Sequence, residues 1–191
     1  MRQSLWSRGA ACCALDLHAP AITDGVISLT RFRPDDAPVL CAADDDPEMR
    51  RRFGFPADFV PSIEHTWAVV ARWAQQWDAG ERYPFAVRTV ADHVLVGGCE
   101  LWPRGEGVAN VSYWTYPEHR RAGFASRAVA LLCDVVLSAG EFARLEILTD
   151  PDHVVSRRIA LRNGFEEVGV RDGRVLHVRL RRAIGREHST P

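Results

Sequence analysis

Apolar and polar residues alternate in several short segments of this chain, which is the pattern of strands with one buried face. The first is residues 26–32 (VISLTRF), which are also rich in β-forming side chains. Another pair of segments is joined by Asp172-Gly173, the strongest hairpin signal in the chain. We expect strands at residues 26–32, 83–90, 93–102, 108–116 and 144–150, and two more within residues 165–180.

Apolar residues at helical spacing predict the elements between these strands. Five of them between residues 63 and 77 recur every three or four positions behind Ser62, a good N-cap, which predicts a helix to about Asp78. A short helix is expected after Pro34, and two more near residues 124–139 and 153–163. The polar, proline-interrupted residues 44–62 predict a loop with little regular structure.

The element order is β-α-α-β-β-β-α-β-α-β-β, which predicts one mixed α/β domain over residues 26–181. Residues 1–25 are expected to form a loosely ordered extension. Residues 182–191 are expected to form a flexible tail.

Composition narrows the possible functions. The 191 residues hold 24 Lys+Arg against 25 Asp+Glu, so the broad positive field of a nucleic-acid-binding protein is absent. No apolar run approaches the roughly 20 residues that span a bilayer. Five cysteines lie without CxxC pairs or histidines at zinc-ligand spacing, so we expect reduced thiols in a cytoplasmic protein and no metal site.

The segment with the clearest chemistry is residues 120–126 (RRAGFAS), here called the anion cradle, which connects a strand to a helix. A tight turn at Gly123 leaves the first amides of the helix unpaired, and these amides attract anions. Arg120 and Arg121 add positive charge, and the Ser126 hydroxyl adds a donor. The segment therefore predicts a site for a phosphate or diphosphate.

Arg120-x-x-Gly123-x-Ala125 resembles the Arg/Gln-x-x-Gly-x-Gly/Ala signature of the GNAT N-acetyltransferase superfamily. Residues 113–118 before it, and Ser156 and the Asn-Gly-Phe of residues 163–165 after it, are similar to the branch that acetylates the N-termini of ribosomal proteins. The similarity covers nearly all of residues 26–181.

This resemblance implies a mostly antiparallel sheet, splayed into a V between the fourth and fifth strands, with helices on both faces. It also implies acetyl-CoA as co-substrate, its pantetheine arm paired with one strand and its diphosphate held by the anion cradle. The implied cofactor-binding residues are Tyr113, Trp114, Thr115, Tyr116, Arg120, Arg121, Ala122, Gly123, Phe124, Ala125 and Ser126.

The chain departs from the family at three positions. His153 stands where related enzymes often have asparagine, and Ala160 where many members have tyrosine. Arg127 follows the signature where this branch usually has glutamate. The first two changes concern the thioester side of the site.

Direct acetyl transfer to an amine requires a proton acceptor for the amine and a partner for the leaving thiolate. Glu100 is the favoured base, because alternation places this carboxylate among apolar residues, where it must face a cleft or be paired; Glu146 is the second choice. The resemblance to this branch makes Ser156 the candidate either for proton donation to the leaving thiolate or for a hydrogen bond to it. His153 either replaces the missing asparagine as a hydrogen-bond donor or relays a proton.

The resemblance implies that residues 44–59 and the helix after them select the acceptor amine; there Asp45 and Asp46 would receive a cation, and Phe53 and Phe55 would form an apolar wall. The sequence thus predicts an N-acetyltransferase acting on a peptide N-terminus or a small amine, as a monomer or homodimer. An aminoglycoside or polyamine acetyltransferase remains open, as does a CoA-binding regulatory module without catalysis.

Overall fold

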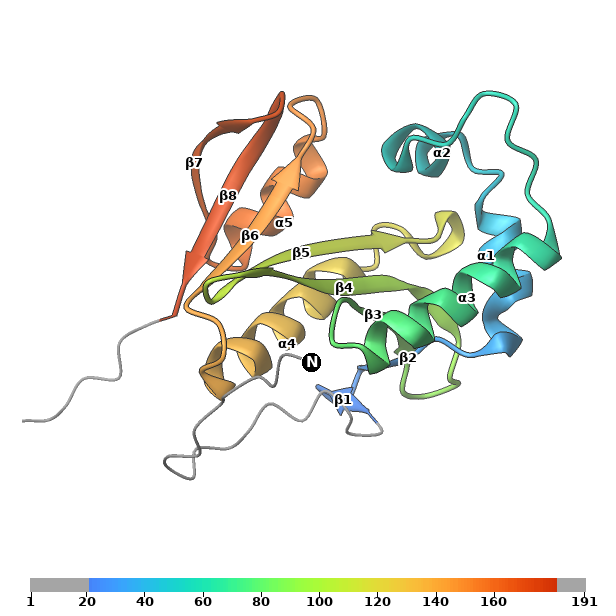
Figure 1. Cartoon of the computed structure of the whole chain (residues 1–191), viewed down its shortest axis with the longest axis horizontal. Helices are drawn as coiled ribbons and strands as arrows, with labels where there is room; N and C mark the ends of the chain where they lie inside the picture. Colours follow the sequence, from blue (N-terminus) through green and yellow to red (C-terminus); the bar gives the residue numbers. More distant parts are fainter. Residues whose placement is uncertain (1–20, 182–191) are drawn as a thin grey trace, which may run out of the picture.

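The computed structural model describes residues 21–181. Eight strands form one sheet in the order β1-β2-β3-β4-β5-β6-β8-β7 (Figure 1). All neighbouring strands are antiparallel except β5 and β6. The strands are β1 (Ile22–Thr23), β2 (Ile27–Arg31), β3 (Tyr83–Thr89), β4 (Leu95–Gly105), β5 (Val108–Thr115), β6 (Arg144–Thr149), β7 (Glu166–Arg171) and β8 (Arg174–Leu180).

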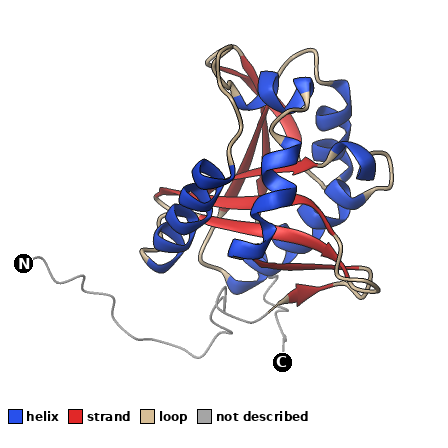
Figure 2. Ribbon diagram, turned by 90° about the vertical axis from the view of Figure 1, so that its right-hand side faces the viewer, coloured by secondary structure: helices blue, strands red, loops and turns tan. Residues whose placement is uncertain are grey.

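Five α-helices in the described residues cover both faces of this sheet (Figure 2). Ser62 caps the helix Ile63–Asp78 as expected, because its side chain accepts a hydrogen bond from the His65 amide. The helices are α1 (Ala37–Ala43), α2 (Pro47–Phe53), α3 (Ile63–Asp78), α4 (Phe124–Ala139) and α5 (Val154–Arg162), with short 3-10 turns at Pro34–Asp36 and Pro117–His119.

The sheet opens into a V between β5 and β6, as the resemblance implied. These two strands pair at only three positions, from Val108 with Arg144 to Asn110 with Glu146. Beyond Asn110 the strands separate, and residues 111–115 and 147–149 have no partner across the gap. The separation leaves room for a ligand between the two halves of the sheet.

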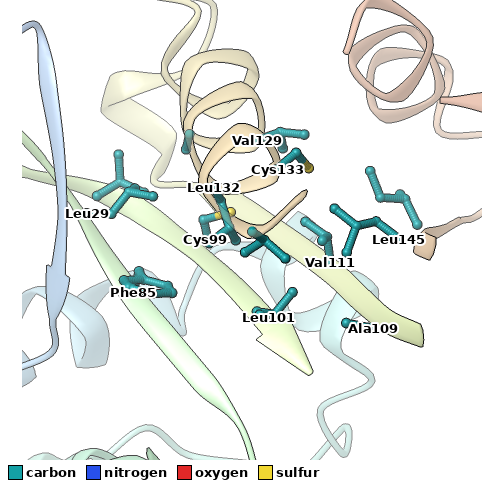
Figure 3. Packing of buried hydrophobic residues seen from close by; sticks show 14 of the residues in the cluster. Leu29, Phe85, Cys99, Leu101, Ala109, Val111, Val129, Leu132, Cys133 and Leu145 are labelled. Carbon is teal, nitrogen blue, oxygen red and sulfur yellow. The ribbon is translucent and has the colours of Figure 1, made fainter. Parts of the chain in front are cut away.

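The larger of two apolar clusters holds the sheet against α4. Cys99, Leu101 and Val111 from the strands meet Leu132 and Cys133 of α4, all at most 1% exposed (Figure 3). A second cluster joins α1, α2 and α3 to the sheet through residues such as Leu40, Met49, Val70 and Ala86. Both clusters support the strands that border the V.

Two sequence expectations need correction. Residues 44–62 are not wholly irregular, because Pro47–Phe53 forms α2, whose N-cap Asp46 accepts a hydrogen bond from the Met49 amide. Within the expected extension 1–25, β1 pairs with β2 through Ile22 and Leu29. The expectations for residues 1–20 and for the tail 182–191 lie outside the described residues.

The face of β4 opposite α4 carries the indole of Trp114 directly over Gly98. A Cβ added to Gly98 would lie 2.1 Å from Cζ2 of that ring. We expect Gly98→Ala to lower the free energy of unfolding by about 1–3 kcal/mol, the usual cost of overpacking, measured by urea unfolding.

The matched control for this substitution is Trp114→Phe, which removes the part of the ring that the new methyl group meets. In the Trp114→Phe background, Gly98→Ala should cost much less. An equal cost in both backgrounds would show that the Trp114 ring does not impose the glycine.

Candidate active site

A pocket of about 440 Å³ opens where β5 and β6 separate. Its walls are the diverging parts of these two strands, the first turn of α4, one side of α5, and α2. In Figure 1, α2 lies on the opposite side of the molecule from α5 and β8, with β5 running below and between them. The same cavity touches Gly123 at the start of α4 and Ser156 in α5, so one space connects the anion cradle to the candidate catalytic residues.

The backbone of the anion cradle is arranged to bind an anion. Arg121 has φ +66° and Gly123, the N-cap of α4, has φ +83°, so the chain turns sharply before the helix begins. Within residues 21–181, the amides of residues 121–126 have no hydrogen-bond partner. A Cβ on Gly123 would meet nothing within 4 Å, so the space beside these amides is open.

Two side chains of the cradle are oriented by other parts of the protein. Ser126 Oγ accepts a hydrogen bond from Asn163 Nδ2 at 3.2 Å, which leaves the Ser126 proton free to donate. Arg120 is held by two acidic side chains of the α2 region, at 2.6 Å from Asp46 Oδ1 and 3.2 Å from Glu48 Oε2. The α2 segment is thereby tied to the cradle.

Most of the residues expected to bind the cofactor meet at this pocket. Tyr116 and Ala122 are the exceptions: the Tyr116 side chain is buried in the second apolar cluster, and Ala122 faces solvent. Those that line the pocket are Tyr113, Trp114, Thr115, Arg120, Arg121, Gly123, Phe124, Ala125 and Ser126.

Glu100, the favoured base in the sequence analysis, does not reach the pocket. Its carboxylate is 3% exposed and pairs with Arg82 through two contacts, Nε–Oε1 at 2.5 Å and Nη2–Oε2 at 2.7 Å. Glu146 is likewise buried, between Arg144 and Arg171. Neither carboxylate lines the pocket, and both bind arginines, so both residues are better explained as internal ion pairs than as the base.

The other two catalytic candidates do line the pocket. Ser156 is in the first turn of α5, and its Oγ lies 2.8 Å from the Tyr113 hydroxyl. His153 is the residue before α5, with Nε2 3.5 Å from Glu48 Oε1. Burial, helped by the guanidinium of Arg52, lowers the pKa of His153 against the opposing effect of Glu48, so the imidazole is neutral at pH 7.

Of the four residues expected to bind the acceptor, the structure brings one to the pocket. Phe53 lines it, whereas Phe55 packs against Phe53 and Phe59 outside it. Asp46 caps α2 and binds Arg120, and the exposed Asp45 lies 3.8 Å from Arg50. Asp45 and Asp46 are therefore both paired with arginines.

Sequence reasoning missed several pocket residues. One of them is Arg52 on α2, a helix whose start is marked by Asp46 as N-cap and Pro47 at the first helical position. Arg52 binds Asp150 and Asp152 at the start of the β6–α5 loop, and Arg174 of β8 contacts Asp150 at 3.3 Å. No local sequence signal indicates these contacts, because the partners are about 100 and 24 residues apart.

The residues of the pocket fit acetyl-CoA. Five arginines line it against two carboxylates among the described residues, which suits a ligand that carries several phosphate charges. The unpaired amides offer a place for a diphosphate, and the gap between β5 and β6 offers an extended slot for a narrow arm. Over residues 21–181, no cluster of three His, Cys, Asp or Glu side chains is arranged to hold a metal ion.

The comparisons with known proteins identify the family of this chain. Residues 27–166 match the family model described as acetyltransferase (GNAT) domain. The chain therefore belongs to the GNAT acetyltransferase family, and it is an acyltransferase that uses acetyl-CoA. No helix in the described part of the chain is long and apolar enough to cross a membrane.

Among particular relatives, the chain is 27% identical over 150 residues to the uncharacterized N-acetyltransferase YoaA of Bacillus subtilis, covering 78% of this chain and 83% of YoaA. Its fold is similar to that of the ribosomal L7/L12 alpha-N-protein acetyltransferase RimL in complex with coenzyme A, with a TM-score of 0.74 and 17% identity. The match covers 84% of this chain and 97% of RimL. The fold is also similar to that of RimJ of Mycobacterium smegmatis in complex with a CoA disulfide, with a TM-score of 0.66 and 19% identity. That match covers 85% of this chain and 86% of RimJ.

Proposed function

We propose that this protein transfers the acetyl group of acetyl-CoA to a primary amine by direct attack within a ternary complex. The observation that carries the proposal is the single pocket that connects the unpaired amides of the anion cradle to Ser156 and His153. Bound at the cradle, acetyl-CoA supplies a thioester carbonyl to the amine. The protein then needs to hold both partners and to accept one proton.

The cysteines favour direct attack over an acyl-enzyme. In residues 21–181 the three cysteines lie away from the pocket lining. Cys99 and Cys133 are buried, and burial raises the pKa of the Cys133 thiol to about 12, which keeps it protonated and unreactive. The acceptor amine is therefore the nucleophile.

We assign the proton acceptor to His153. Its imidazole is neutral, lines the pocket, and is exposed enough to meet an incoming amine. After proton uptake, the nearby Glu48 carboxylate stabilises the imidazolium at 3.5 Å. His153 thus has the environment of a base that regains its charge balance during the reaction.

The charges around the pocket favour an α-amino acceptor over a polycation. The carboxylates in the described lining, Glu48 and Asp150, are both engaged by arginines, so an aminoglycoside or polyamine finds no uncommitted anion. Neutralising an α-amino group at pH 7 costs about 1 kcal/mol, whereas a lysine-like amine costs about 4.6 kcal/mol. We therefore propose a peptide or amino-acid α-amino group as the acceptor.

The test is thiol release from acetyl-CoA with a panel of short peptides, amino acids, polyamines and aminoglycosides. We expect turnover with free peptide or amino-acid α-amino groups and none with N-blocked peptides. Preference for polycations would overturn the acceptor class. Tight CoA binding without turnover of any amine would instead support the regulatory binding module.

A further inference from the structure

Tyr113 and Ser156 connect the two sides of the V at the bottom of the pocket. Tyr113 lies on β5, three residues beyond Asn110, where pairing with β6 ends. Ser156 lies on α5, which follows β6 on the opposite side. The Tyr113 hydroxyl is 2.8 Å from Ser156 Oγ and 3.0 Å from the Ser156 carbonyl oxygen.

The Ser156 hydroxyl depends on Tyr113 for its orientation. A serine inside a helix commonly turns its hydroxyl back to the carbonyl four residues earlier, which here would be that of Asp152. Among residues 21–181, the hydroxyl bonds only to the Tyr113 phenol. The Tyr113 ring is itself fixed, since it packs against the larger apolar cluster.

The Tyr113–Ser156 pair has two possible hydrogen-bonding states, which differ in the group to which the Tyr113 hydroxyl donates. If Tyr113 donates to the Ser156 carbonyl, the serine proton points to the phenol oxygen and is unavailable to the pocket. If Tyr113 donates to Ser156 Oγ, the serine proton is free for a pocket atom. Burial raises the pKa of Tyr113 to about 12, so the phenol keeps its proton and remains a donor in both states.

We propose that Tyr113 is a positioning residue: by donating to Ser156 Oγ it aims the Ser156 proton at the sulfur of coenzyme A. The inference rests on the proposed function. As the C–N bond forms, the C–S bond breaks and its electron pair goes to sulfur. The proton lost by the amine goes to His153, while Ser156 keeps its own proton and stabilises the thiolate by a hydrogen bond.

The first measurement needs no acceptor. The thiol of CoA bound to the protein is titrated by its thiolate absorbance, as the difference between samples with and without CoA. A donated hydrogen bond to the thiolate should lower the pKa of the bound thiol relative to free CoA, by about one unit. Tyr113→Phe should return this pKa most of the way to the free value, as should Ser156→Ala.

The second measurement is kinetic. Tyr113→Phe should lower kcat by about 10-fold, as expected for the loss of one charge-assisted hydrogen bond in the transition state. The KM for acetyl-CoA should stay within about twofold of the wild-type value, and Tm within about 2 °C. In the Tyr113→Phe background, Ser156→Ala should cause little further loss, because the two groups act as a unit.

Tyr83→Phe is the matched control, since Tyr83 also packs against the larger apolar cluster but lies outside the pocket lining. It should leave both the thiol pKa and kcat unchanged. An unchanged thiol pKa in Tyr113→Phe, or fully additive losses in the double variant, would overturn the positioning role. If no amine is acetylated but the thiol pKa shifts occur as expected, the proposed function is overturned and the positioning role of Tyr113 stands.

Discussion

Gly123→Val is expected to abolish acetyl-CoA binding, with affinity reduced at least 100-fold in calorimetric titration. The valine side chain would occupy the open space beside the unpaired amides of the anion cradle. It would also oppose the left-handed backbone at φ +83°, which costs an L-residue about 1–2 kcal/mol. Both effects remove the geometry that presents the amides to a diphosphate.

Gly105→Val separates these two effects. Gly105 has φ +86°, a Cβ added to it would meet nothing within 4 Å, and it lies at the β4–β5 turn outside the pocket lining. This variant should carry a similar backbone strain yet bind acetyl-CoA as the wild type does. Retained affinity in Gly123→Val would show that the cofactor phosphates bind elsewhere.

His153→Ala is expected to lower kcat by about 100-fold or more, within the usual contribution of a general base. The neutral imidazole is the active form, and burial lowers its pKa, so the wild-type kcat should show an acid decline below the usual histidine range, in addition to the decline that protonation of the acceptor amine causes in every variant. The variant should lack the decline that belongs to His153 and keep the one that belongs to the amine. His153 makes no side-chain cap hydrogen bond to α5, so the replacement should leave the helix intact.

Two further variants distinguish the possible roles of His153. Asparagine retains hydrogen bonding but accepts no proton, so His153→Asn should be as slow as the alanine variant. Recovery of activity by asparagine would assign His153 to hydrogen bonding instead. His119→Ala, which changes the other histidine of the described pocket lining, should keep the wild-type pH profile.

The fold was largely predictable because its signals are local. Alternation identified the long strands, and Ser62 and Gly123 marked helix starts that the structure contains. The opening between β5 and β6 came from the family resemblance and not from periodicity. The helix α2 was missed because prolines and aromatic residues around it obscured the start signal at Asp46-Pro47.

The site was less predictable because its contacts are long-range. Alternation correctly placed Glu100 among apolar neighbours, but it gave no means of choosing between a cleft and an ion pair with Arg82, 18 residues away. The contact between Tyr113 and Ser156 spans 43 residues and depends on the folded positions of β5 and α5. Which partner a side chain meets in these cases is decided by tertiary packing, which the local sequence pattern does not contain.

The unpaired stretches of β5 and β6 also bear on aggregation. An exposed strand edge commonly recruits a strand from another molecule, and proteins have to guard against it. Here the two unpaired edges face each other inside the sheet and border the pocket, whereas the outer edges of the sheet are β1 and β7. The unpaired backbone groups of β5 and β6 are therefore placed to pair with an extended ligand in the pocket, and the strand edges that another molecule could reach are those of β1 and β7.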